Sequence, residues 1–401
     1  MPIHRERPIS AFVVFGDDWG RHVSTLQHLF GRIAQHATVI WINGIGQREP
    51  SLSDIGRALQ KLGAMIRRDR ARSSPSARGR MAPPQHIIEP RVLPWHSNRL
   101  VSAINRASLK HDIQMSLKRA GVGDFVMVTG SPPSANVIGE CGESASIYFC
   151  MDDFLLLPGT SPRMIAPLEQ ELLRRVDAVV ATAQRLVETK VSVSGRGFYL
   201  PQGVNYEHFA TGRATPAELR DLPRPIVGFA GGVGPAVDLA TLHAISETIP
   251  NGSVVLVGPV TVPRESLVAP NLHVFGPRPY EDLPAYVQAF DVGIIPYVEN
   301  DWTRTVDSLK LLEYLAAGVP VVASPLPEVR KYSSAVLTAR LGREFAEAVK
   351  ANLAPSGSAR GEVAQAFAAN HSWERRAARL LDIVDEVCVA KSRPGGPPMR
   401  G

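Results

Sequence analysis

A lysine and a carboxylate three residues apart are the first side chains in this sequence that could act together. Lys310 and Glu313 lie in the stretch 307–324, where apolar residues recur at helical spacing before Gly318 and Pro320. Residues three apart share one side of a helix. Such a pair can hold a phosphate through the ammonium and a sugar hydroxyl through the carboxylate. A surface ion pair is the alternative that these two residues alone leave open.

Two adjacent carboxylates form a second candidate group. Asp152 and Asp153 directly follow the apolar run 146–151, which predicts a buried strand. Neighbouring side chains on an extended chain point in opposite directions, so only one of the two is expected to face a cleft. Close carboxylates also raise one another's pKa, which suits a general base. A helix cap or turn stabiliser is the alternative interpretation.

A loop follows the predicted strand 10–15. In parallel sheets, ligands bind at the carboxyl ends of strands. This loop is therefore a candidate acceptor or substrate loop, although an ordinary connection explains it equally well. Its candidate residues are Gly16, Asp17, Trp19 and His22.

A glycine loop, 231–234, follows another predicted strand. Gly231 and Gly232 could let backbone N–H groups approach a phosphate. The loop is not a complete GxGxxG, and the next strand ends in Gly258-Pro259 rather than in an acid. Both features count against a nicotinamide cofactor.

These loops require a scaffold of alternating strands and helices. Residues 10–15, 24–34 and 38–43 predict a strand, a helix and a strand, the βαβ unit that begins a doubly wound sheet. The same alternation begins again near Ile226. In the stretch 307–324, Gly318 is expected to take the left-handed conformation that ends a helix. The sequence therefore predicts an α/β protein with two tandem Rossmann-like, doubly wound domains.

The predicted boundaries follow from where the alternation stops and resumes. They are an N-terminal domain over 1–205, a linker over 206–224, a C-terminal domain over 225–370, a final helix over 371–390 and a disordered tail over 391–401.

Charge is unevenly distributed along the 401 residues, whose net charge is +6. The part up to Asn205 has 25 Lys and Arg against 17 Asp and Glu, whereas the rest has 19 against 21. The first part is thus expected to meet an anionic surface or substrate. Within it, 61–80 reads as a surface helix running into a flexible basic loop, with docking to an anionic membrane leaflet as the alternative. No aromatic-interleaved basic motif supports nucleic-acid binding.

Other features favour a cytoplasmic protein without a membrane span. The three cysteines have no CxxC spacing, so neither a disulfide framework nor a zinc site is indicated. No apolar run approaches the ~20 residues that cross a bilayer. The run 10–15 follows two arginines as in a signal peptide, but it is too short and Gly16-Asp17-Asp18 replaces a cleavage site.

Five segments, in this order, resemble the GT-B glycosyltransferases, in particular the family 4 type and its bacterial exopolysaccharide and teichuronic-acid-type relatives. The resemblance covers nearly the whole chain and is most specific in the second half. It implies a cleft between the domains and a C-terminal helix that crosses back onto the first. The segments are 177–186, 200–209, 274–297, 307–324 and 370–376.

The resemblance implies that a sugar passes from a UDP- or GDP-linked donor to a glycan or lipid-linked acceptor of an envelope or exopolysaccharide, without a metal or a cofactor. The acceptor would bind the N-terminal domain. By analogy, Lys310 would contact the diphosphate and Glu313 the ribose hydroxyls, while Arg278 and Tyr280 would meet the base or a phosphate. The implied donor-binding residues are Gly231, Gly232, Arg278, Tyr280, Ser308, Lys310 and Glu313.

One departure from the family concerns catalysis. Retaining members carry a glutamate eight residues before the ribose-binding one, and here that position is Thr305. An inverting enzyme needs a general base for the acceptor hydroxyl, and Asp152 or Asp153 could supply it. Asp152 is favoured because the family often places an acid four residues after a strand tyrosine, here Tyr148. Both stereochemical outcomes stay open.

Two other functions fit the same scaffold. A nucleotide-sugar epimerase would need further cleft acids and histidines, which the sequence does not place. A non-catalytic nucleotide-sugar-binding partner would keep Lys310 and Glu313 beside an inactive cleft, and Thr305 keeps this alternative open. The favoured prediction is a cytoplasmic glycosyltransferase, working at the inner face of the plasma membrane.

Overall fold

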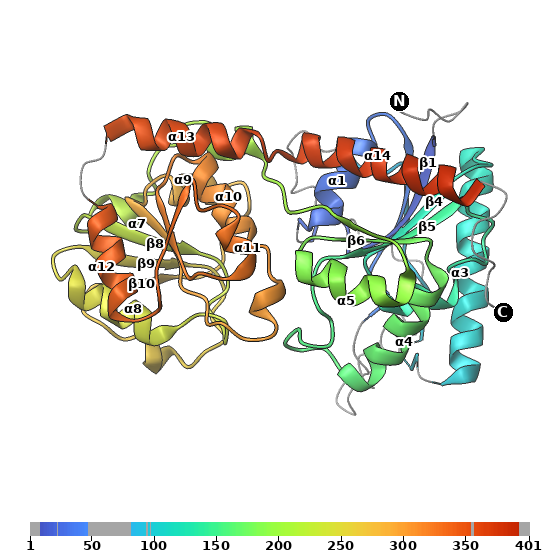
Figure 1. Ribbon diagram of the computed structural model, residues 1–401, viewed down its shortest axis with the longest axis horizontal. Coiled ribbons are helices and arrows are strands. Elements are labelled where there is room, and N and C mark those ends of the chain that lie inside the picture. Colours follow the sequence, from blue (N-terminus) through green and yellow to red (C-terminus); the bar gives the residue numbers. More distant parts are fainter. Residues whose placement is uncertain are drawn as a thin grey trace. The chain divides into compact units, whose positions relative to one another are not determined.

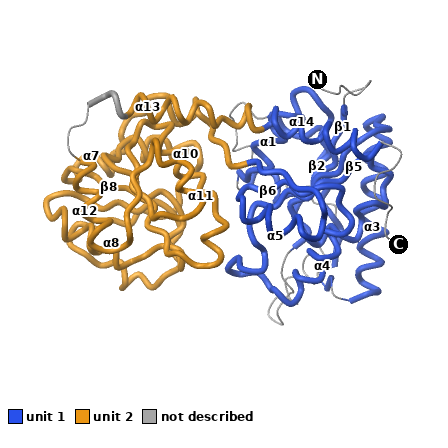
Figure 2. Tube along the Cα trace, in the orientation of Figure 1, with its two compact units in different colours: residues 1–200, 377–401 blue, residues 201–376 orange. Residues whose placement is uncertain are grey.

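The computed structural model describes residues 9–21, 23–46, 82–93, 95–96, 98–353 and 357–392. The chain divides into two compact units (Figure 2): a first unit of residues 1–200 and 377–401, and a second unit of residues 201–376. His22, the basic stretch 61–80 and residues 393–401 of the predicted tail lie outside the described residues.

The first unit contains a seven-stranded sheet in which every neighbouring pair is parallel (Figure 1). The strand order is β3-β2-β1-β4-β5-β6-β7. Four of the first five strands have runs of fully buried residues, as expected for strands that helices cover on both faces. The strands are β1 (Ala11–Phe15), β2 (Thr38–Ile42), β3 (His86–Ile88), β4 (Val126–Thr129), β5 (Ala145–Cys150), β6 (Ala178–Ala181) and β7 (Gly197–Tyr199).

Helices connect these strands in the right order for a doubly wound sheet. The described helices of the first unit are α1 (Thr25–Ile33), α3 (Arg99–Ala120), the 3-10 helix η2 (Pro132–Asn136), α4 (Pro162–Arg175) and α5 (Gln184–Ser194).

The second unit contains a six-stranded parallel sheet with the order β10-β9-β8-β11-β12-β13. Its strands are β8 (Ile226–Ala230), β9 (Ser253–Val257), β10 (Leu272–Phe275), β11 (Val292–Ile295), β12 (Val321–Ala323) and β13 (Val336–Thr338). Its longer helices are α8 (Leu239–Thr248), α10 (Leu309–Ala316), α12 (Arg343–Asn352) and α13 (Gly357–Ala369), and its short ones are α6 (Tyr206–Ala210), α7 (Ala217–Arg220), η3 (Arg264–Leu267), α9 (Leu283–Val287), η4 (Thr303–Thr305) and α11 (Pro327–Arg330).

The two sheets confirm the predicted tandem of doubly wound α/β domains. The stretch 206–224, however, is not an open linker. It forms α6 and α7 and belongs to the second unit. Phe209 and Leu219 explain the difference, because both side chains are buried in the core of that unit.

The last helix, α14 (Trp373–Ser392), starts in the second unit and belongs to the first from residue 377 onward. Its buried residues there include Leu380, Ile383 and Val387. Near its end, the ammonium of Lys391 lies 2.8 Å from a carboxylate oxygen of Asp177. That carboxylate also accepts a hydrogen bond from the backbone N–H of Ser146, so it links the helix to the sheet of the first unit.

Candidate functional site

The strand order of the second unit reverses between β8 and β11. From β8 the sheet extends to β9 and β10 on one side, and to β11, β12 and β13 on the other. Ligands of open α/β sheets bind outside the carboxyl ends of the strands at such a switch point. Gly231 follows β8, and Pro296-Tyr297 follow β11, so these residues border the candidate site.

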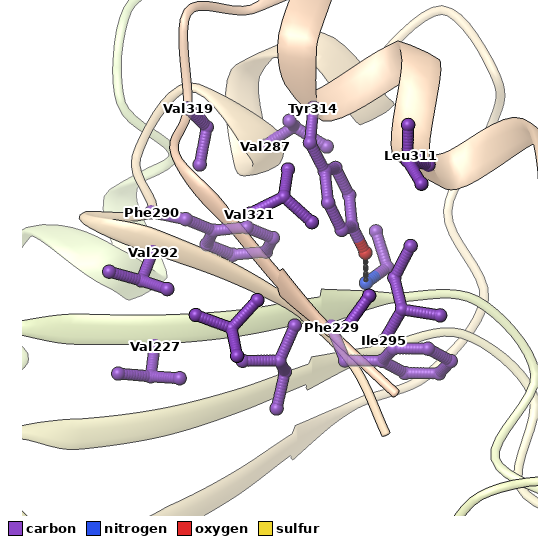
Figure 3. Close-up of a cluster of buried hydrophobic side chains, with 14 of the residues drawn as sticks. Val227, Phe229, Val287, Phe290, Val292, Ile295, Leu311, Tyr314, Val319 and Val321 are labelled. Carbon is purple, nitrogen blue, oxygen red and sulfur yellow. Dashed lines mark hydrogen bonds between the residues drawn. The ribbon is translucent and has the colours of Figure 1, made fainter. Parts of the chain in front are cut away.

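Helix α10 is fixed over this point by Tyr314 (Figure 3). Ala230 is the last residue of β8, and its backbone N–H donates a hydrogen bond of 2.7 Å to the buried hydroxyl of Tyr314. Gly293 of β11 makes room for the ring, since a Cβ there would lie 2.5 Å from Cδ2 of Tyr314. This hydrogen bond and this close contact both help to fix the position of α10 on the sheet.

The end of α10 confirms the turn predicted from the sequence. Gly318 has φ 74°, in the left-handed region. The N–H groups of Gly318 and Val319 donate to the carbonyls of Leu315 and Tyr314, which is the Schellman arrangement. These two hydrogen bonds end α10 and turn the chain into β12.

Lys310, in that first turn, reaches the switch point. Its Nζ lies 5.9 Å from the ring centroids of both Phe229 and Tyr297, which flank the ends of β8 and β11. Gly231 leaves space for the side chain, because a Cβ there would lie 1.8 Å from Cε of Lys310. Burial alone would lower the pKa of Lys310, but Tyr297 and Glu313 raise it above its ordinary value, so the ammonium stays charged.

Glu313 lies one turn further along α10 and is half-buried. No ion pair joins it to Lys310 in this structure, so the alternative of a simple surface ion pair does not apply. Burial raises the pKa of Glu313 to about 7, although the nearby Lys310 lowers it in part. The carboxyl group of Glu313 makes no hydrogen bond with another described residue, so it remains available to a ligand.

The raised pKa of Glu313 predicts a pH-dependent stability. The unfolded chain ionises this group near pH 4.5, whereas the folded chain holds its proton up to about pH 7. Between these values the folded state binds more protons, so the wild-type free energy of unfolding falls as pH rises. A Glu313→Gln variant lacks this loss. In urea unfolding, we expect the free energy of unfolding of the variant, relative to that of wild type, to be larger at pH 8 than at pH 5. An equal difference at both pH values would contradict the raised pKa of Glu313.

The residues just before α10 include one hydroxyl without a partner. Ser308 is the N-cap of α10 but makes no capping hydrogen bond, and its buried Oγ has no hydrogen-bond partner among the described residues. Asp307, by contrast, is well satisfied: it accepts from the N–H of Gln202 and the hydroxyl of Tyr332 and pairs with Lys331 at 3.1 Å. Buried polar groups are normally hydrogen-bonded, so Ser308 is a candidate ligand contact and Asp307 a structural anchor.

The glycine loop 231–234 does not lead directly into a helix. Helix α8 begins only at Leu239, and the carboxylate of its N-cap, Asp238, already accepts from the N–H of Thr241. The N–H of Gly231 donates to the carbonyl of Val257 at 2.7 Å. The N–H of Gly232 makes no hydrogen bond within the described residues. Backbone contact with a phosphate would therefore come from Gly232 rather than from the start of α8.

Arg278 and Tyr280 follow β10 and contact the short helices. The guanidinium of Arg278 pairs with Glu218 at 2.7 Å and donates to the hydroxyl of Tyr286, and these two bonds raise the pKa of Arg278. The Tyr280 ring stacks on His208, with centroids 4.7 Å apart. Their predicted role toward a base or phosphate stays a prediction.

The first unit contains a cavity of about 710 Å³ at its own switch point, between β1 and β4. Gly16 and Asp17 line it from the end of β1, and Gly130 and Ser131 from the end of β4. Gly16 is required there because a Cβ would lie 2.1 Å from the buried ring of Trp41. The predicted acceptor loop thus borders a real cavity.

Trp19, another residue of that loop, packs beside the cavity. Its ring meets the Trp41 ring edge to face at a centroid distance of 4.8 Å, and the backbone N–H of Trp19 donates to Oδ1 of Asn43. The indole N–H of Trp41 donates to the carbonyl of Asp17 at 2.9 Å. These contacts fix the loop backbone, and His22 lies outside the described residues.

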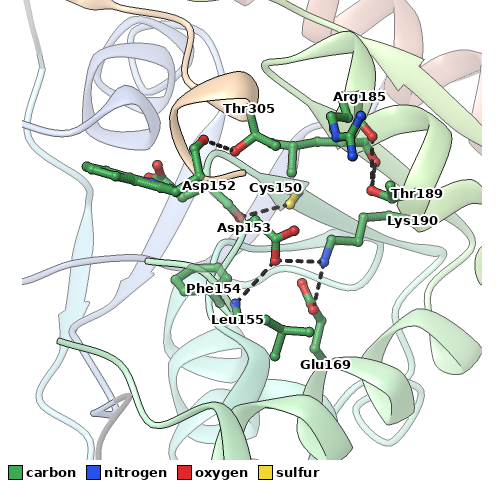
Figure 4. A network of polar contacts seen from close by, with 12 residues as sticks. Cys150, Asp152, Asp153, Phe154, Leu155, Glu169, Arg185, Thr189, Lys190 and Thr305 are labelled. Atoms are coloured by element: carbon green, nitrogen blue, oxygen red, sulfur yellow. Dashed lines mark hydrogen bonds and ion pairs between the residues drawn. The ribbon is translucent and has the colours of Figure 1, made fainter. Parts of the chain in front are cut away.

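Asp152 and Asp153 point to different places, as expected for neighbouring residues after a strand (Figure 4). Asp152 lines the cavity. The Asp153 carboxylate instead accepts from the N–H of Leu155 at 3.2 Å and pairs with the ammonium of Lys190 at 3.4 Å. Asp153 therefore stabilises the turn, and Asp152 is the carboxylate that a ligand in the cavity can meet.

A buried polar network supports this turn (Figure 4). Lys190 pairs with Glu169 at 2.8 Å, and Glu169 accepts from the hydroxyl of Tyr148 at 2.8 Å. Burial alone would lower the pKa of Lys190, but Glu169 raises it above its ordinary value. The sulfur of Cys150 donates to the carbonyl of Asp152, and burial raises the pKa of this thiol. The network keeps the end of β5 in one conformation.

Two residues that contribute to the candidate sites, Tyr297 and Lys190, are not among the site residues predicted from the sequence. Tyr297 directly follows an apolar strand, and that position at the carboxyl end of a strand was its signal. Lys190 stands four residues after the buried Leu186, on the apolar face of α5, which is an unusual place for a lysine.

The described residues contain no group of three or more His, Cys, Asp and Glu side chains that could hold a metal ion. Within the same ranges, no helix combines the length and apolar character needed to span a membrane.

Residues 224–354, most of the second unit, match the protein family described as "Glycosyl transferases group 1". The chain is also 29% identical over 180 residues to TuaH of Bacillus subtilis (strain 168), named as a glycosyltransferase of teichuronic acid biosynthesis. That match covers 42% of this chain and 45% of TuaH, less than half the length of the relative.

Solved structures resemble the chain over nearly its full length. Anabaena Alr3699/HepE in complex with UDP has a TM-score of 0.63 at 13% identity, over 95% of this chain and 100% of HepE. The UDP-forming α,α-trehalose-phosphate synthase of Burkholderia vietnamiensis has a TM-score of 0.64 at 13% identity, over 95% of this chain and 100% of the synthase. The chain therefore has the GT-B fold, and its residues 224–354 are similar to the group 1 glycosyl transferases.

Proposed function

We propose that this chain, with its GT-B fold and its similarity to the group 1 glycosyl transferases, is a glycosyltransferase that moves a sugar from a nucleotide-sugar donor to an acceptor bound in the first unit. One observation carries the proposal most strongly. The charged Lys310 ammonium reaches the switch point of the second unit, beside an open glycine loop, and no carboxylate of the described residues pairs with it there.

The donor half of the reaction is assigned to the second unit. Lys310 would meet the diphosphate, and the N–H of Gly232 and the partnerless hydroxyl of Ser308 would add hydrogen bonds. Glu313, ionised in the complex, would accept from the ribose hydroxyls. A fixed cation beside the diphosphate stabilises the negative charge that develops as the sugar leaves. We propose that the charge of Lys310 is sufficient for this stabilisation and that the reaction needs neither a metal ion nor a cofactor.

The donor nucleotide is proposed to be UDP or GDP. HepE structures hold UDP and UDP-glucose, and their fold is the fold of this chain. Arg278 and Tyr280 are engaged with the short helices, so the proposal assigns them no contact with the nucleotide base.

The acceptor half is assigned to the cavity of the first unit. Asp152 lines it and would act as general base toward an acceptor hydroxyl. We propose a glycan or lipid-linked acceptor of a cell-envelope polysaccharide, which the name of TuaH supports. We propose that the enzyme works in the cytoplasm, at the inner face of the membrane.

The direct test incubates the full chain with a panel of UDP- and GDP-linked sugars, with and without EDTA. We expect binding of at least one donor and slow release of its nucleoside diphosphate by hydrolysis, unaffected by EDTA. Binding of no donor would overturn the proposal. Tight binding without any release, even with polyprenyl-linked glycan acceptors present, would instead favour the non-catalytic partner.

A further inference from the structure

Asp307 stands directly before the N-cap of α10, and its carboxylate is almost fully buried. The side chain is 1% exposed, and Lys310 follows three residues further along the chain. A carboxylate is costly to bury unless charged and polar partners surround it. Burial raises the pKa of Asp307, although Lys331 lowers it in part. The partners of this carboxylate therefore determine how its negative charge acts on the start of α10.

The described partners of this carboxylate all lie outside α10. Its Oδ2 accepts from the backbone N–H of Gln202 at 2.8 Å and lies 3.1 Å from the ammonium of Lys331. Its Oδ1 accepts from the hydroxyl of Tyr332 at 3.2 Å. The Lys331 ammonium also lies 2.7 Å from a carboxylate oxygen of the buried Glu328, so one cation serves two acids. Both oxygens of Asp307 are thus engaged away from the helix that follows it.

The segment that binds Asp307 is itself closely packed within the second unit. The carbonyl of Gln202 accepts from Nε of Arg376 at 3.1 Å. Gly203 leaves no space for a larger residue, since a Cβ there would lie 2.7 Å from the ring of Trp373. The hydrogen bond from Gln202 to Asp307 therefore anchors the start of α10 to a segment that is held on both sides.

The start of α10 has unused hydrogen-bonding groups next to this anchor. Within the described residues, the buried Oγ of Ser308 has no partner, and the N–H groups of Leu309 and Lys310 make no hydrogen bond. Open N–H groups at the start of a helix, with a cation beside them, attract an anion. An uncompensated carboxylate at Asp307 would oppose that attraction, and the ammonium of Lys331 offsets it.

We propose that Asp307 and Lys331 are positioning residues of the donor site. Asp307 anchors the start of α10 to Gln202. Lys331 offsets the negative charge of Asp307, so that the first turn of the helix stays open to the phosphates of the donor. The inference rests on the proposed function for the identity of the ligand, whereas the same arrangement would attract any diphosphate. Neither side chain would touch the sugar or the nucleotide.

The test is calorimetric titration of the full-length protein with UDP, GDP and inorganic pyrophosphate at pH 8. Asp307→Asn keeps the hydrogen bonds without the charge, and we expect it to bind pyrophosphate like wild type. Asp307→Ala removes the anchor and should bind about fivefold more weakly. Lys331→Met leaves the carboxylate uncompensated and should bind about tenfold more weakly. Lys331→Arg keeps the charge and should recover most of that loss.

A double variant separates the effect of charge from damage to the structure. Asp307→Asn combined with Lys331→Met removes both charges, and we expect it to bind pyrophosphate more tightly than Lys331→Met alone. A purely structural role predicts the reverse, because the double variant has lost more native groups. Equal or weaker binding by the double variant overturns the proposal, as does wild-type binding by Lys331→Met.

Loss of one partner of a buried ion pair is destabilising, so circular dichroism and urea unfolding would check every variant. If Lys331→Met does not fold, Asp307→Ala and Asp307→Asn decide the question, and equal binding by these two overturns the anchor.

Arg224→Met is a matched control in the same unit. Arg224 pairs with Asp291 at 2.9 Å, and Asp291 also accepts from a backbone N–H, that of Ile226, the first residue of β8. This pair lies at the opposite end of the strand from the donor site, so we expect Arg224→Met to bind pyrophosphate like wild type. The same loss as in Lys331→Met would overturn the proposal.

The three ligands distinguish this inference from the proposed function. A wild-type protein that binds pyrophosphate but neither UDP nor GDP would contradict the proposed donor, while the variants would still test the two positioning residues with pyrophosphate. A wild-type protein that binds none of the three would overturn both proposals.

Discussion

An Asp152→Asn variant is expected to bind the donor as wild type does and to lose nearly all sugar transfer. General-base catalysis typically contributes 10²–10⁴-fold, so we expect kcat to fall by about that factor. The asparagine keeps the size of the side chain but cannot take the proton of an acceptor hydroxyl. The measurement pairs calorimetric titration of UDP or GDP with a transfer assay over a range of pH.

The local structure makes this variant a clean test. The carbonyl of Asp152 accepts from the sulfur of Cys150, and the carbonyl of Met151 accepts from the hydroxyl of Thr182 at 3.1 Å. Asp153 is separately tied to Lys190. The backbone of the turn is therefore held by groups that the substitution leaves in place. A loss of activity would then report the chemistry of one carboxylate rather than a collapsed loop.

Two neighbouring acids serve as controls for Asp152. Asp17→Asn removes another carboxylate from the same cavity, and we expect it to change the KM for the acceptor more than kcat. Asp153→Asn removes a partner of the buried Lys190, and we expect reduced stability in urea unfolding. If Asp152→Asn keeps full transfer, or if Asp17→Asn is equally inactive, the base assignment is wrong.

The scaffold could be predicted because its signals are local. The left-handed Gly318 at the end of α10 and the apolar strand after it both follow from residue types within a few positions. The linker predicted over 206–224 differs from the structure because the signals that decide this stretch are not local. Its turn-rich composition suggested a linker, but Phe209 and Leu219 find their core only through residues far along the chain.

The sites could be predicted only in part, because their geometry is made by distant pairs. The hydrogen bond from Ala230 to Tyr314 that holds α10 joins residues 84 positions apart. The two-residue alternation of a strand indicated that Asp152 and Asp153 diverge, but not which one meets the cavity. That depended on Lys190, whose ammonium pairs with Asp153 from a separate helix. Residue types indicated which chemistry is possible, and contacts between distant residues determined which carboxylate faces the cavity.

A Lys310→Ala variant is expected to weaken binding of UDP or GDP by about 10- to 150-fold, the usual worth of a hydrogen bond to a charged group. Transfer should fall further than binding, because the lost charge stabilises the departing diphosphate more than the bound donor. Calorimetric titration gives the first quantity and a transfer assay at saturating donor gives the second. Unchanged donor binding would contradict the assignment of Lys310.

Two glycine substitutions probe the same ammonium without removing it. A Cβ at residue 231 would lie 1.8 Å from Cε of Lys310, so Gly231→Ala should displace the side chain and weaken donor binding strongly. At residue 232 the nearest atom, Cγ of Pro259, would be 3.8 Å away. Gly232→Ala keeps its backbone N–H and leaves the side chain of Lys310 in place, so it should weaken donor binding less than Gly231→Ala does. Equal damage from both variants would mean that the loop itself, rather than the position of Lys310, controls donor binding.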